Sequence, residues 1–475
     1  MQGKGPGTLA SKAQVQVMME INEIEVDSYE LQHKVYAKKV RGKFRNLRWA
    51  AAGLLLLIYF IVPWLKVDGR HPILFDVPGR KFYVLGSVYW PQDVFYLALL
   101  LIVLVGVLFI FTAVAGRLWC GYACPQSVFT DIFISVERFF EGSASKRQKL
   151  DDGSWGAVKI EKKAAKHIVW LAMSFAISFT FVAYFVPAEL LLERVMTATL
   201  TWSNIFWLLF FTVSVYTFCA LWRELICLVP CPYGRFQSAL IDADTLVIGY
   251  DAKRGEPRGH KSREGDNKGS GDCIDCSLCV QVCPTGIDIR NGLQCECIGC
   301  ALCIDACNAV MCKTGRSKGL IRYSSMRALS GGVTKVVRPR VIAYTVCIVL
   351  LFGFFAYKLY SRTPLEMQIL RDRSALYIKG ADGSITNVYT LRVTNMDIDD
   401  HKYKVSAAGL DDSLKVRLAM GENPITVKSG EVYEGLVVLR AGREIERKIN
   451  RLNFIVQSVD DKALRAVRDA SFVMP

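Results

Sequence analysis

Residues 273–307 read CIDCSLCVQVCPTGIDIRNGLQCECIGCALCIDAC and carry one cysteine spacing twice. The first copy, Cys-x2-Cys-x2-Cys-x3-Cys-Pro, begins at Cys273, and the second, Cys-x2-Cys-x2-Cys-x3-Cys, begins at Cys297. A cubane [4Fe–4S] cluster needs four thiolates. Three closely spaced cysteines can wrap one cluster, while the fourth, on the outgoing turn, reaches the other cluster. Zinc sites use cysteine pairs and do not account for this spacing. The array therefore predicts two [4Fe–4S] clusters.

The spacing also predicts which cysteines share a cluster. Cluster one is expected on Cys273, Cys276, Cys279 and Cys307, and cluster two on Cys297, Cys300, Cys303 and Cys283. Cys295 and Cys312 are surplus to the pattern and are interpreted as packing or spare thiols, with an exchange of ligands as the alternative. Residues 251–272 are polar and glycine-rich, as is typical of a linker. Linker and array together form the predicted domain 251–320, which resembles bacterial-type two-cluster ferredoxins.

Long uncharged runs lie on both sides of the array. They occupy residues 49–65, 94–115, 168–186, a fourth stretch ending at Trp222, and residues 341–357. Each has about 17 residues or more, enough to cross most of the roughly 30 Å of bilayer hydrocarbon. The chain is therefore predicted to be a membrane protein, with a four-helix membrane region at 49–250 and a fifth transmembrane helix at 341–360.

The distribution of charge predicts the sidedness of these helices. Lys and Arg number 35 in segments 1–48, 116–167 and 223–340, against five in the loops 66–93 and 187–200. Cytoplasmic loops of membrane proteins are enriched in Lys and Arg. We therefore expect the N-terminal tail (1–48) and the ferredoxin-like domain in the cytoplasm, and residues 361–475 on the other side. Fourteen of the 16 cysteines fall in the segments predicted to be cytoplasmic, where thiols stay reduced.

Composition excludes two other classes of protein. The net charge of +15 is accounted for by the basic loops beside the spans, and no nucleic-acid recognition motif accompanies them. The chain has five histidines, of which only His167 lies near a span, at its edge. A haem inside the bilayer would need paired axial histidines within the helices. Nucleic-acid binding and membrane haem are therefore not expected.

Two further cysteine pairs follow the second and fourth uncharged runs. WCGYACPQ at 119–126 and CLVPCPYGRFQ at 227–237 each contain Cys-x3-Cys-Pro. If the helix continues, cysteines four residues apart share a face, and Pro at the next position suits a break or a first helical turn. If the two halves pack together, four thiols converge: Cys120, Cys124, Cys227 and Cys231. Soft thiolates of this kind suit copper(I), zinc or an iron–sulfur cluster, and free cysteines buried by helix packing are the alternative.

Two other segments have a periodicity that predicts structure. Residues 127–140 are amphipathic and are expected to form a helix at the membrane interface or against the bundle. Short alternating runs separated by turns follow the last span, at residues 387–394, 402–407, 414–419, 432–440 and 452–457. This pattern indicates a small antiparallel sandwich in 361–475, which would dock a partner or act as a stabilising cap.

The whole arrangement resembles the bacterial cytochrome-oxidase accessory proteins called CcoG, FixG or RdxA. WCGYACPQ, CLVPCPYGRFQ, the cysteine array and the outer sandwich carry the resemblance, which covers nearly the full chain. It implies a bacterial inner membrane, a periplasmic C-terminal domain of immunoglobulin-like fold, and assistance in assembling a cbb-type haem–copper oxidase. It further implies an oxidoreductase that reduces copper(II) to copper(I) before copper reaches the oxidase catalytic subunit or its copper chaperones. The electron donor stays unknown.

The four thiols of the membrane pairs are then the hypothetical catalytic copper site. Two alternatives stay open at the level of the sequence. The protein would otherwise be a quinol-linked electron-transfer subunit that feeds a periplasmic reductase, or a non-catalytic assembly scaffold whose clusters serve only folding.

Overall fold

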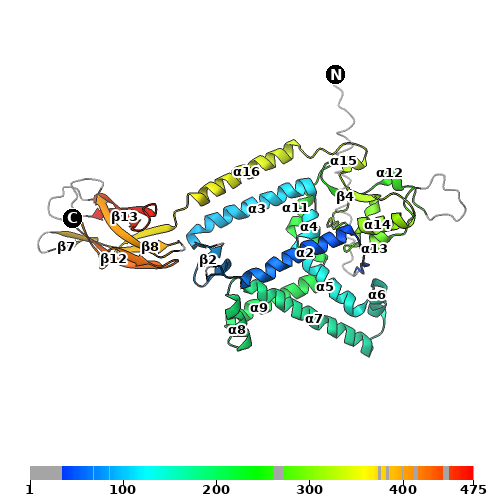
Figure 1. Cartoon of the computed structure of the whole chain (residues 1–475), viewed down its shortest axis with the longest axis horizontal. Coiled ribbons are helices and arrows are strands. Elements are labelled where there is room, and N and C mark those ends of the chain that lie inside the picture. The colour runs from blue at the N-terminus through cyan, green and yellow to red at the C-terminus, as the bar shows by residue number, and fades with distance from the viewer. Residues whose placement is uncertain are drawn as a thin grey trace, which may run out of the picture.

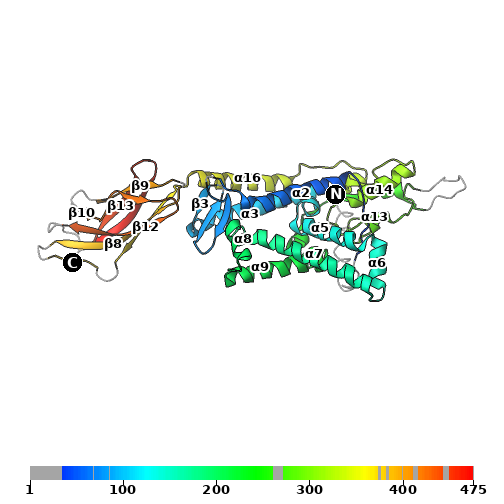
Figure 2. The same cartoon turned by 60° about the horizontal axis from the view of Figure 1, so that its bottom comes forward.

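The computed structural model describes residues 35–67, 69–84, 86–259, 271–372, 376–380, 384–397, 399–409, 416–441 and 449–473. A cysteine-rich domain lies at one end of the molecule, a β-sandwich lies at the other, and long helices run between them (Figures 1 and 2). Five helices in this part of the chain are long and apolar enough to cross a membrane: Lys43–Trp64, Pro91–Ala115, Ala157–Val182, Trp202–Trp222 and Pro339–Tyr360. The prediction of about five spans is confirmed. The first helix begins at Lys43, inside the segment predicted as a tail.

The five helices form two groups. α3 (Val94–Ala115) packs along α16 (Pro339–Tyr360), and a Cβ on Gly106 would lie only 1.8 Å from the Cδ1 of Ile348. The other group contains α2 (Lys43–Ile61), α7 (Ala157–Val182) and α9 (Trp202–Val215), which the π-helix η3 (Tyr216–Trp222) continues. Their surfaces are apolar and largely exposed in the monomer, as expected for helices that face lipid.

The amphipathic segment after the first cysteine pair is a helix, as predicted. α5 (Pro125–Glu141) buries one face against α7 and follows the one-turn α4 (Leu118–Tyr122). Phe133 of α5 is fully buried, and its carbonyl accepts a 3.0 Å hydrogen bond from the indole of Trp170. α6 (Ala144–Asp152) then returns the chain to α7.

Small elements at the other end of the helices do not follow from the sequence pattern. β1 (Ile73–Asp76), β2 (Lys81–Val84) and β3 (Ser87–Tyr89) form an antiparallel sheet in the loop between α2 and α3, and α8 (Ala188–Met196) precedes α9. The 3-10 turn η2 (Pro91–Asp93) leads into α3. At the end of α16, Arg362 binds Asp93 at 2.7 Å and the Val88 carbonyl at 2.9 Å, which ties this helix to the sheet.

The cysteine-rich domain is organised around a two-stranded antiparallel sheet. β4 (Val247–Tyr250) pairs with β5 (Ile321–Ser324), and both strands lie just outside the predicted limits of 251 and 320. Between them lie α12 (Ala252–Gly255), α13 (Leu278–Gln281), η4 (Ile289–Asn291) and α14 (Leu302–Lys313). The core packs Ile248 and Ile321 from the strands against Cys279 and Ala301, so the sheet closes the cysteine array into one unit. Short helices flank it: α10 (Leu225–Leu228) and α11 (Pro232–Leu240) before, and α15 (Met326–Leu329) after.

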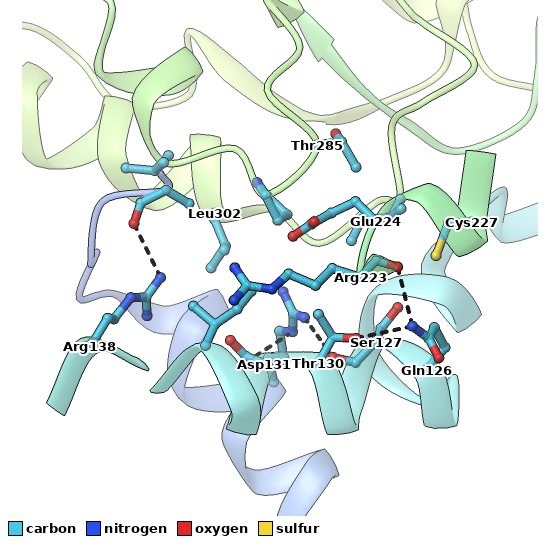
Figure 3. A pocket seen from close by; sticks show the side chains of 16 residues that line it. Gln126, Ser127, Thr130, Asp131, Arg138, Arg223, Glu224, Cys227, Thr285 and Leu302 are labelled. Atoms are coloured by element: carbon cyan, nitrogen blue, oxygen red, sulfur yellow. Dashed lines mark hydrogen bonds and ion pairs between the residues drawn. The ribbon is translucent and has the colours of Figure 1, made fainter. Parts of the chain in front are cut away.

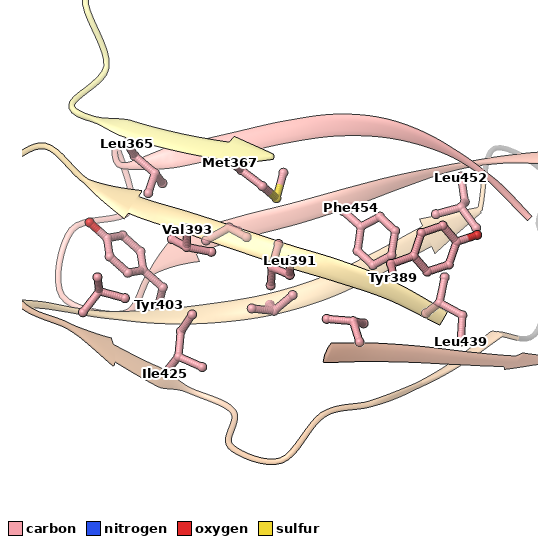
Figure 4. Packing of buried hydrophobic residues seen from close by; sticks show 14 of the residues in the cluster. Leu365, Met367, Tyr389, Leu391, Val393, Tyr403, Ile425, Leu439, Leu452 and Phe454 are labelled. Atoms are coloured by element: carbon pink, nitrogen blue, oxygen red, sulfur yellow. The ribbon is translucent and has the colours of Figure 1, made fainter. Parts of the chain in front are cut away.

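The C-terminal domain is the predicted antiparallel sandwich. One sheet has the order β10-β12-β8-β6, with β7 beside β8, and the other has the order β11-β9-β13-β14. The strands are β6 (Leu365–Arg371), β7 (Ile378–Lys379), β8 (Ile385–Asn395), β9 (His401–Gly409), β10 (Val416–Ala419), β11 (Ile425–Val427), β12 (Val432–Ala441), β13 (Ile449–Ser458) and β14 (Arg465–Val473). Alternate residues point into the core, such as Tyr389, Leu391 and Val393 of β8, and they meet Phe454 of the opposite sheet (Figure 4). Residues 414–415 of the predicted third strand lie outside the described residues.

The alternation on β12 makes a stability prediction. Leu439 is fully buried, whereas Leu436 on the same strand is 63% exposed. Leu439→Ala should destabilise the sandwich by about 2–5 kcal/mol through lost burial and a cavity. Leu436→Ala should change its stability by no more than about 0.5 kcal/mol. Thermal unfolding of the full chain in detergent, followed by the β-sheet circular dichroism signal, measures both. Equal shifts for the two variants would contradict the assignment of inner and outer faces.

Candidate functional site

The four thiols predicted for cluster one line a single cavity. Cys273, Cys276, Cys279 and Cys307 surround it together with apolar side chains, among them Ile321 of β5. Burial raises the pKa of the Cys307 thiol to about 12, and the charges of Cys279, Cys273 and Cys276 contribute to the shift. These three cysteines belong to the first copy of the motif and Cys307 belongs to the second, so the cavity brings together thiols from both copies.

The four thiols predicted for cluster two also lie together. Burial raises the pKa of Cys303 well above its usual value, and the charges of Cys300, Cys297 and Cys283 raise it further. Burial likewise raises the pKa of Cys297 to about 12. Because thiols with raised pKa values are protonated at neutral pH, iron loading must displace their protons.

The donor set fits iron–sulfur clusters. All 16 cysteines lie in the described part of the chain and are free of disulfides. Within that part, no three Cys, His, Asp or Glu groups lie close enough together to hold one metal ion. A cubane cluster does not need such a meeting point, because each of its thiolates binds a different iron. The assignment of each cysteine to a cluster stays a prediction.

The backbone conformation, like the cysteine spacing, repeats between the two copies of the motif. Asp275 and Ser277 of the first copy have φ values of 52° and 53°, and Gly299 and Ala301 of the second have 68° and 61°. A residue other than glycine in the left-handed backbone conformation costs about 1–3 kcal/mol of stability, and such residues persist where the surrounding structure requires them. They turn the chain so that successive cysteines face one side of the loop.

The two membrane cysteine pairs share a second backbone repeat. α3 ends at Gly116 (φ 58°, ψ −126°), and η3 ends at Arg223 (φ 45°, ψ −113°). The backbone therefore turns in the same way after both helices. One short helix then carries Cys120 (α4) and the other carries Cys227 (α10). The second cysteine of each pair, Cys124 or Cys231, is extended and directly precedes the proline that begins the next helix. The helix therefore breaks within each motif, and the proline takes the first helical turn.

These four thiols lie in one region and influence one another electrostatically, although no three of them are close enough to hold one metal ion. Burial raises the pKa of Cys227 to about 12, with Cys124, Cys120 and Cys231 as the next contributors. Burial also raises the pKa of Cys120, whereas a hydrogen bond with Gln237 acts in the opposite direction. The two matched motifs therefore lie side by side, whereas a shared copper site at the four thiols stays a prediction. A fifth thiol, Cys219 of η3, lies 3.8 Å from the Oε1 of Gln126.

Two glutamines that the cysteine spacing does not single out join the motifs reciprocally. Gln126, next to the first Cys-Pro, donates to the carbonyls of Phe218 at 2.9 Å and Arg223 at 3.2 Å. Gln237, six residues after Cys231, donates to the Sγ of Cys120 at 3.2 Å. Each motif thus reaches across to the other half. The signal available in the sequence was that each Cys-Pro is followed by a glutamine within one or two helical turns.

A buried ion-pair network lies under the second motif. Glu137 of α5 is fully buried and binds Arg147 at 2.9 Å, Arg223 at 3.0 Å and Lys166 at 3.7 Å. Lys166 also binds Glu141 at 2.6 Å. Arg223 therefore anchors the turn before Cys227 to α5.

A cavity joins this region to the cysteine-rich domain (Figure 3). Glu224 and Cys227 line it from the second membrane motif, and Arg138 lines it from α5. Thr285 lines it from the other side, and its Oγ1 lies 3.3 Å from the Sγ of Cys283. The cavity thus lies between a membrane thiol and a neighbour of a predicted cluster-two ligand.

Comparison with protein families supports this assignment of cofactors. A 4Fe-4S dicluster domain model matches residues 222–326, a 4Fe-4S binding domain model matches residues 97–142, and a model of the IG-like fold at the C-terminal of FixG matches residues 355–475. Iron–sulfur clusters are therefore cofactors of this membrane protein. The first two matches include the membrane cysteine pairs as well as the array.

Curated relatives match most of the chain. "Nitrogen fixation protein FixG" of Rhizobium meliloti is 37% identical over 426 residues, which cover 80% of this chain and 80% of that protein. "Protein RdxB" of Cereibacter sphaeroides is 37% identical over 440 residues, 87% of this chain and 90% of that protein. "Protein RdxA" of the same organism is 38% identical over 402 residues, 80% of this chain and 84% of that protein. The crystal structure of a FixG-related protein from Vibrio parahaemolyticus has 25% identity and a TM-score of 0.21, and covers 23% of this chain and 95% of that chain.

The cluster-one assignment predicts the outcome of a cysteine exchange. Cys307→Ser should lower the iron content of the purified protein by about half, because one cubane loses a ligand while the other keeps its four. Cys312→Ser is the matched control, since this cysteine is exposed and lies outside the spacing. Iron and acid-labile sulfide analysis with EPR of the reduced protein measures both. Full iron content in Cys307→Ser, or iron loss in Cys312→Ser, would contradict the assignment.

The buried network predicts a large loss of stability. Glu137→Gln leaves three buried cations without their shared carboxylate, which should cost about 3–5 kcal/mol. Glu161→Gln, at an exposed position of α7, is the control and should lie within about 0.5 kcal/mol of the wild type. Thermal unfolding in detergent compares them. A Glu137→Gln protein as stable as the control would show that the network adds no net stability.

Proposed function

This chain belongs to the family of FixG, RdxA and RdxB, and from that premise we propose that it is a cupric reductase. It is a membrane iron–sulfur electron-transfer protein, and in this proposal it reduces copper(II) to copper(I) and so assists assembly of a cbb-type cytochrome oxidase. The observation that supports the proposal most directly is that the two membrane motifs lie side by side next to the cysteine-rich domain, with Gln237 of the second motif hydrogen-bonded to Cys120 of the first and Gly121 packed against Gly299. Binding of copper would then draw Cys120, Cys124, Cys227 and Cys231 together.

Copper is the substrate in this proposal, and the chain's own residues define its site. Thiolates are soft ligands that favour copper(I) over copper(II), so binding at these cysteines assists the reduction. Their pKa values are raised by burial, so copper displaces protons from Cys120 and Cys227 as it binds. Gln237 holds the Sγ of Cys120 through its amide and keeps α11 next to the first motif. The clusters, when bound, supply the electrons one at a time.

In the proposed orientation, the protein that donates electrons and the protein that receives copper lie on opposite sides of the membrane. The cysteine-rich domain and the sandwich lie at opposite ends of the long helices, as Figure 2 shows. In the proposed orientation the cysteine-rich domain is cytoplasmic and meets the electron donor, and the sandwich is periplasmic. There it would dock the oxidase catalytic subunit or a copper chaperone that serves it.

An anaerobic copper-reduction experiment tests the proposal. The purified protein is reduced, copper(II) is added, and copper(I) is followed with a specific chelator while the cluster absorption reports cluster oxidation. Copper(I) should appear in step with cluster oxidation, and the quadruple Cys→Ser variant of the membrane pairs should lose this phase. The matched control is Cys312→Ser with Cys347→Ser, because both side chains are exposed and lie outside the two sites.

Two other outcomes would redirect the proposal. Clusters that stay reduced in the presence of copper(II) would refute cupric reduction and favour a quinol-linked role, which quinol-dependent cluster reduction then tests. Equal copper(I) formation by the wild type and the quadruple variant would remove the membrane thiols from the copper site.

A further inference from the structure

We propose that Gly121 is a positioning residue that lets α4 lie directly on the cluster-two loop, defined here as residues 297–303, so that cluster two is the electron outlet to the membrane thiols. Cluster one is then the more distant carrier, which takes electrons from outside and passes them to cluster two. The inference rests on the proposed function and adds the order of electron transfer to it.

The backbone of α4 and that of the cluster-two loop touch each other. A Cβ added to Gly121 would lie 2.9 Å from the Gly299 oxygen and 3.0 Å from the Cα of Cys300. A Cβ added to Gly299 would in turn lie 2.9 Å from the Arg117 oxygen. Such distances to backbone atoms do not occur for real Cβ atoms without a shift of the chain, so both glycines are required by the close approach.

Each of the two glycines has a counterpart in the other copy of its motif, with which it can be compared. Leu228 stands in the second membrane motif where Gly121 stands in the first, so the Cys-x3-Cys-Pro turn itself does not require glycine. Asp275 stands in the first cluster loop where Gly299 stands in the second, and it adopts the same left-handed conformation with φ 52°. What distinguishes the two glycines from their counterparts is the contact between them.

Other groups hold the same contact. Cys120 packs against the buried cluster of Val282, Ile298, Cys300, Leu302 and Ala306. The Tyr323 hydroxyl donates to the Gly299 oxygen at 2.6 Å and lies 3.4 Å from the Tyr122 hydroxyl of α4. The Arg117 guanidinium donates to the carbonyl of Cys295, just before the loop, and to that of Gly234 at 2.9 Å. Most of these contacts reach the second copy of the cluster motif or its immediate surroundings, while the Arg117–Gly234 hydrogen bond joins α4 to α11.

Cluster one lies away from this contact. Its cavity is lined by residues of the cysteine-rich domain alone, from Tyr250 to Ile321, with none from α4, α5, α10 or α11. Cys276, one of its four thiols, is exposed. A soluble one-electron donor can approach at Cys276, and electrons then pass through cluster two to Cys120.

The electron balance of the step is simple. Each copper(II) at the membrane thiols takes one electron and becomes copper(I), and cluster two is oxidised by one electron. No bond within the protein is formed or broken. A low-potential one-electron reductant, dithionite in the experiment, restores the electron through cluster one.

The test compares Gly121→Ala with Gly53→Ala. Gly53 lies in α2 with nothing within 4 Å of its Cβ position, so the added methyl group is accommodated there. Tyr323→Phe is a second variant, which weakens the same contact without adding an atom. Amide hydrogen exchange of residues 118–122 and 297–303 is measured in copper-free, cluster-loaded protein. Iron content, copper(I) affinity and the rate of cluster oxidation after copper(II) addition are measured on the same preparations.

The expected result is slower electron transfer from the clusters to copper, with unchanged binding of iron and of copper(I). Gly121→Ala should raise hydrogen exchange in both segments and slow copper-driven cluster oxidation severalfold, with iron content and copper(I) affinity unchanged. Tyr323→Phe should change both readouts in the same direction to a smaller extent, and Gly53→Ala should match the wild type. If Gly121→Ala fails to load its clusters, Tyr323→Phe carries the same two readouts.

Three results would overturn the inference or separate it from the proposed function. Faster exchange with an unchanged oxidation rate would refute the positioning role. Unchanged exchange in Gly121→Ala and Tyr323→Phe would refute the contact itself. Wild-type clusters that copper(II) does not oxidise would refute the proposed function, and the exchange measurement would then still decide whether Gly121 holds α4 on the loop.

Discussion

The close packing of α4 on the cluster-two loop is the contact on which this architecture depends. It joins a membrane helix bundle to a soluble cysteine-rich domain through backbone atoms at Gly121 and Gly299 rather than through long side chains. Backbone contacts of this kind have little freedom to adjust, because interiors are close-packed and transmit displacement. The distance between Cys120 and the second half of the cysteine array is therefore set by the fold.

Buried charge supports this junction from the membrane side. Glu137 gathers Arg147, Arg223 and Lys166 in a region where isolated charges would be very costly. Because Arg223 also forms the turn before Cys227, the network ties the geometry of the second cysteine pair to α5. α5 in turn begins directly after Cys124, so both membrane pairs depend on the same helix.

The sequence predicted the broad organisation well where the signals were local. Uncharged runs of sufficient length specify helices that can span a membrane, and the structure has five of them among its described residues. Strict alternation predicted five strands of the sandwich, but β6, β7, β11 and β14 were missed. In β14, RAVRDASFV, the charged residues Arg465, Arg468 and Asp469 break the alternation of polar and apolar residues. The strands β4 and β5 also escaped prediction, because they pair across the whole cysteine array and each is only four residues long.

By itself, the sequence determined the number of thiols, their spacing, the repeat of each motif and the class of each domain. Those properties depend on residues close together in the chain, where covalent geometry limits the possible structures. Only the tertiary structure decided that Gln126 and Gln237 reach across between the halves, that Cys219 lies beside the first pair, and that Gly121 meets Gly299. These contacts join residues about a hundred positions or more apart. Packing of whole elements brings such residues together, and no local pattern records it.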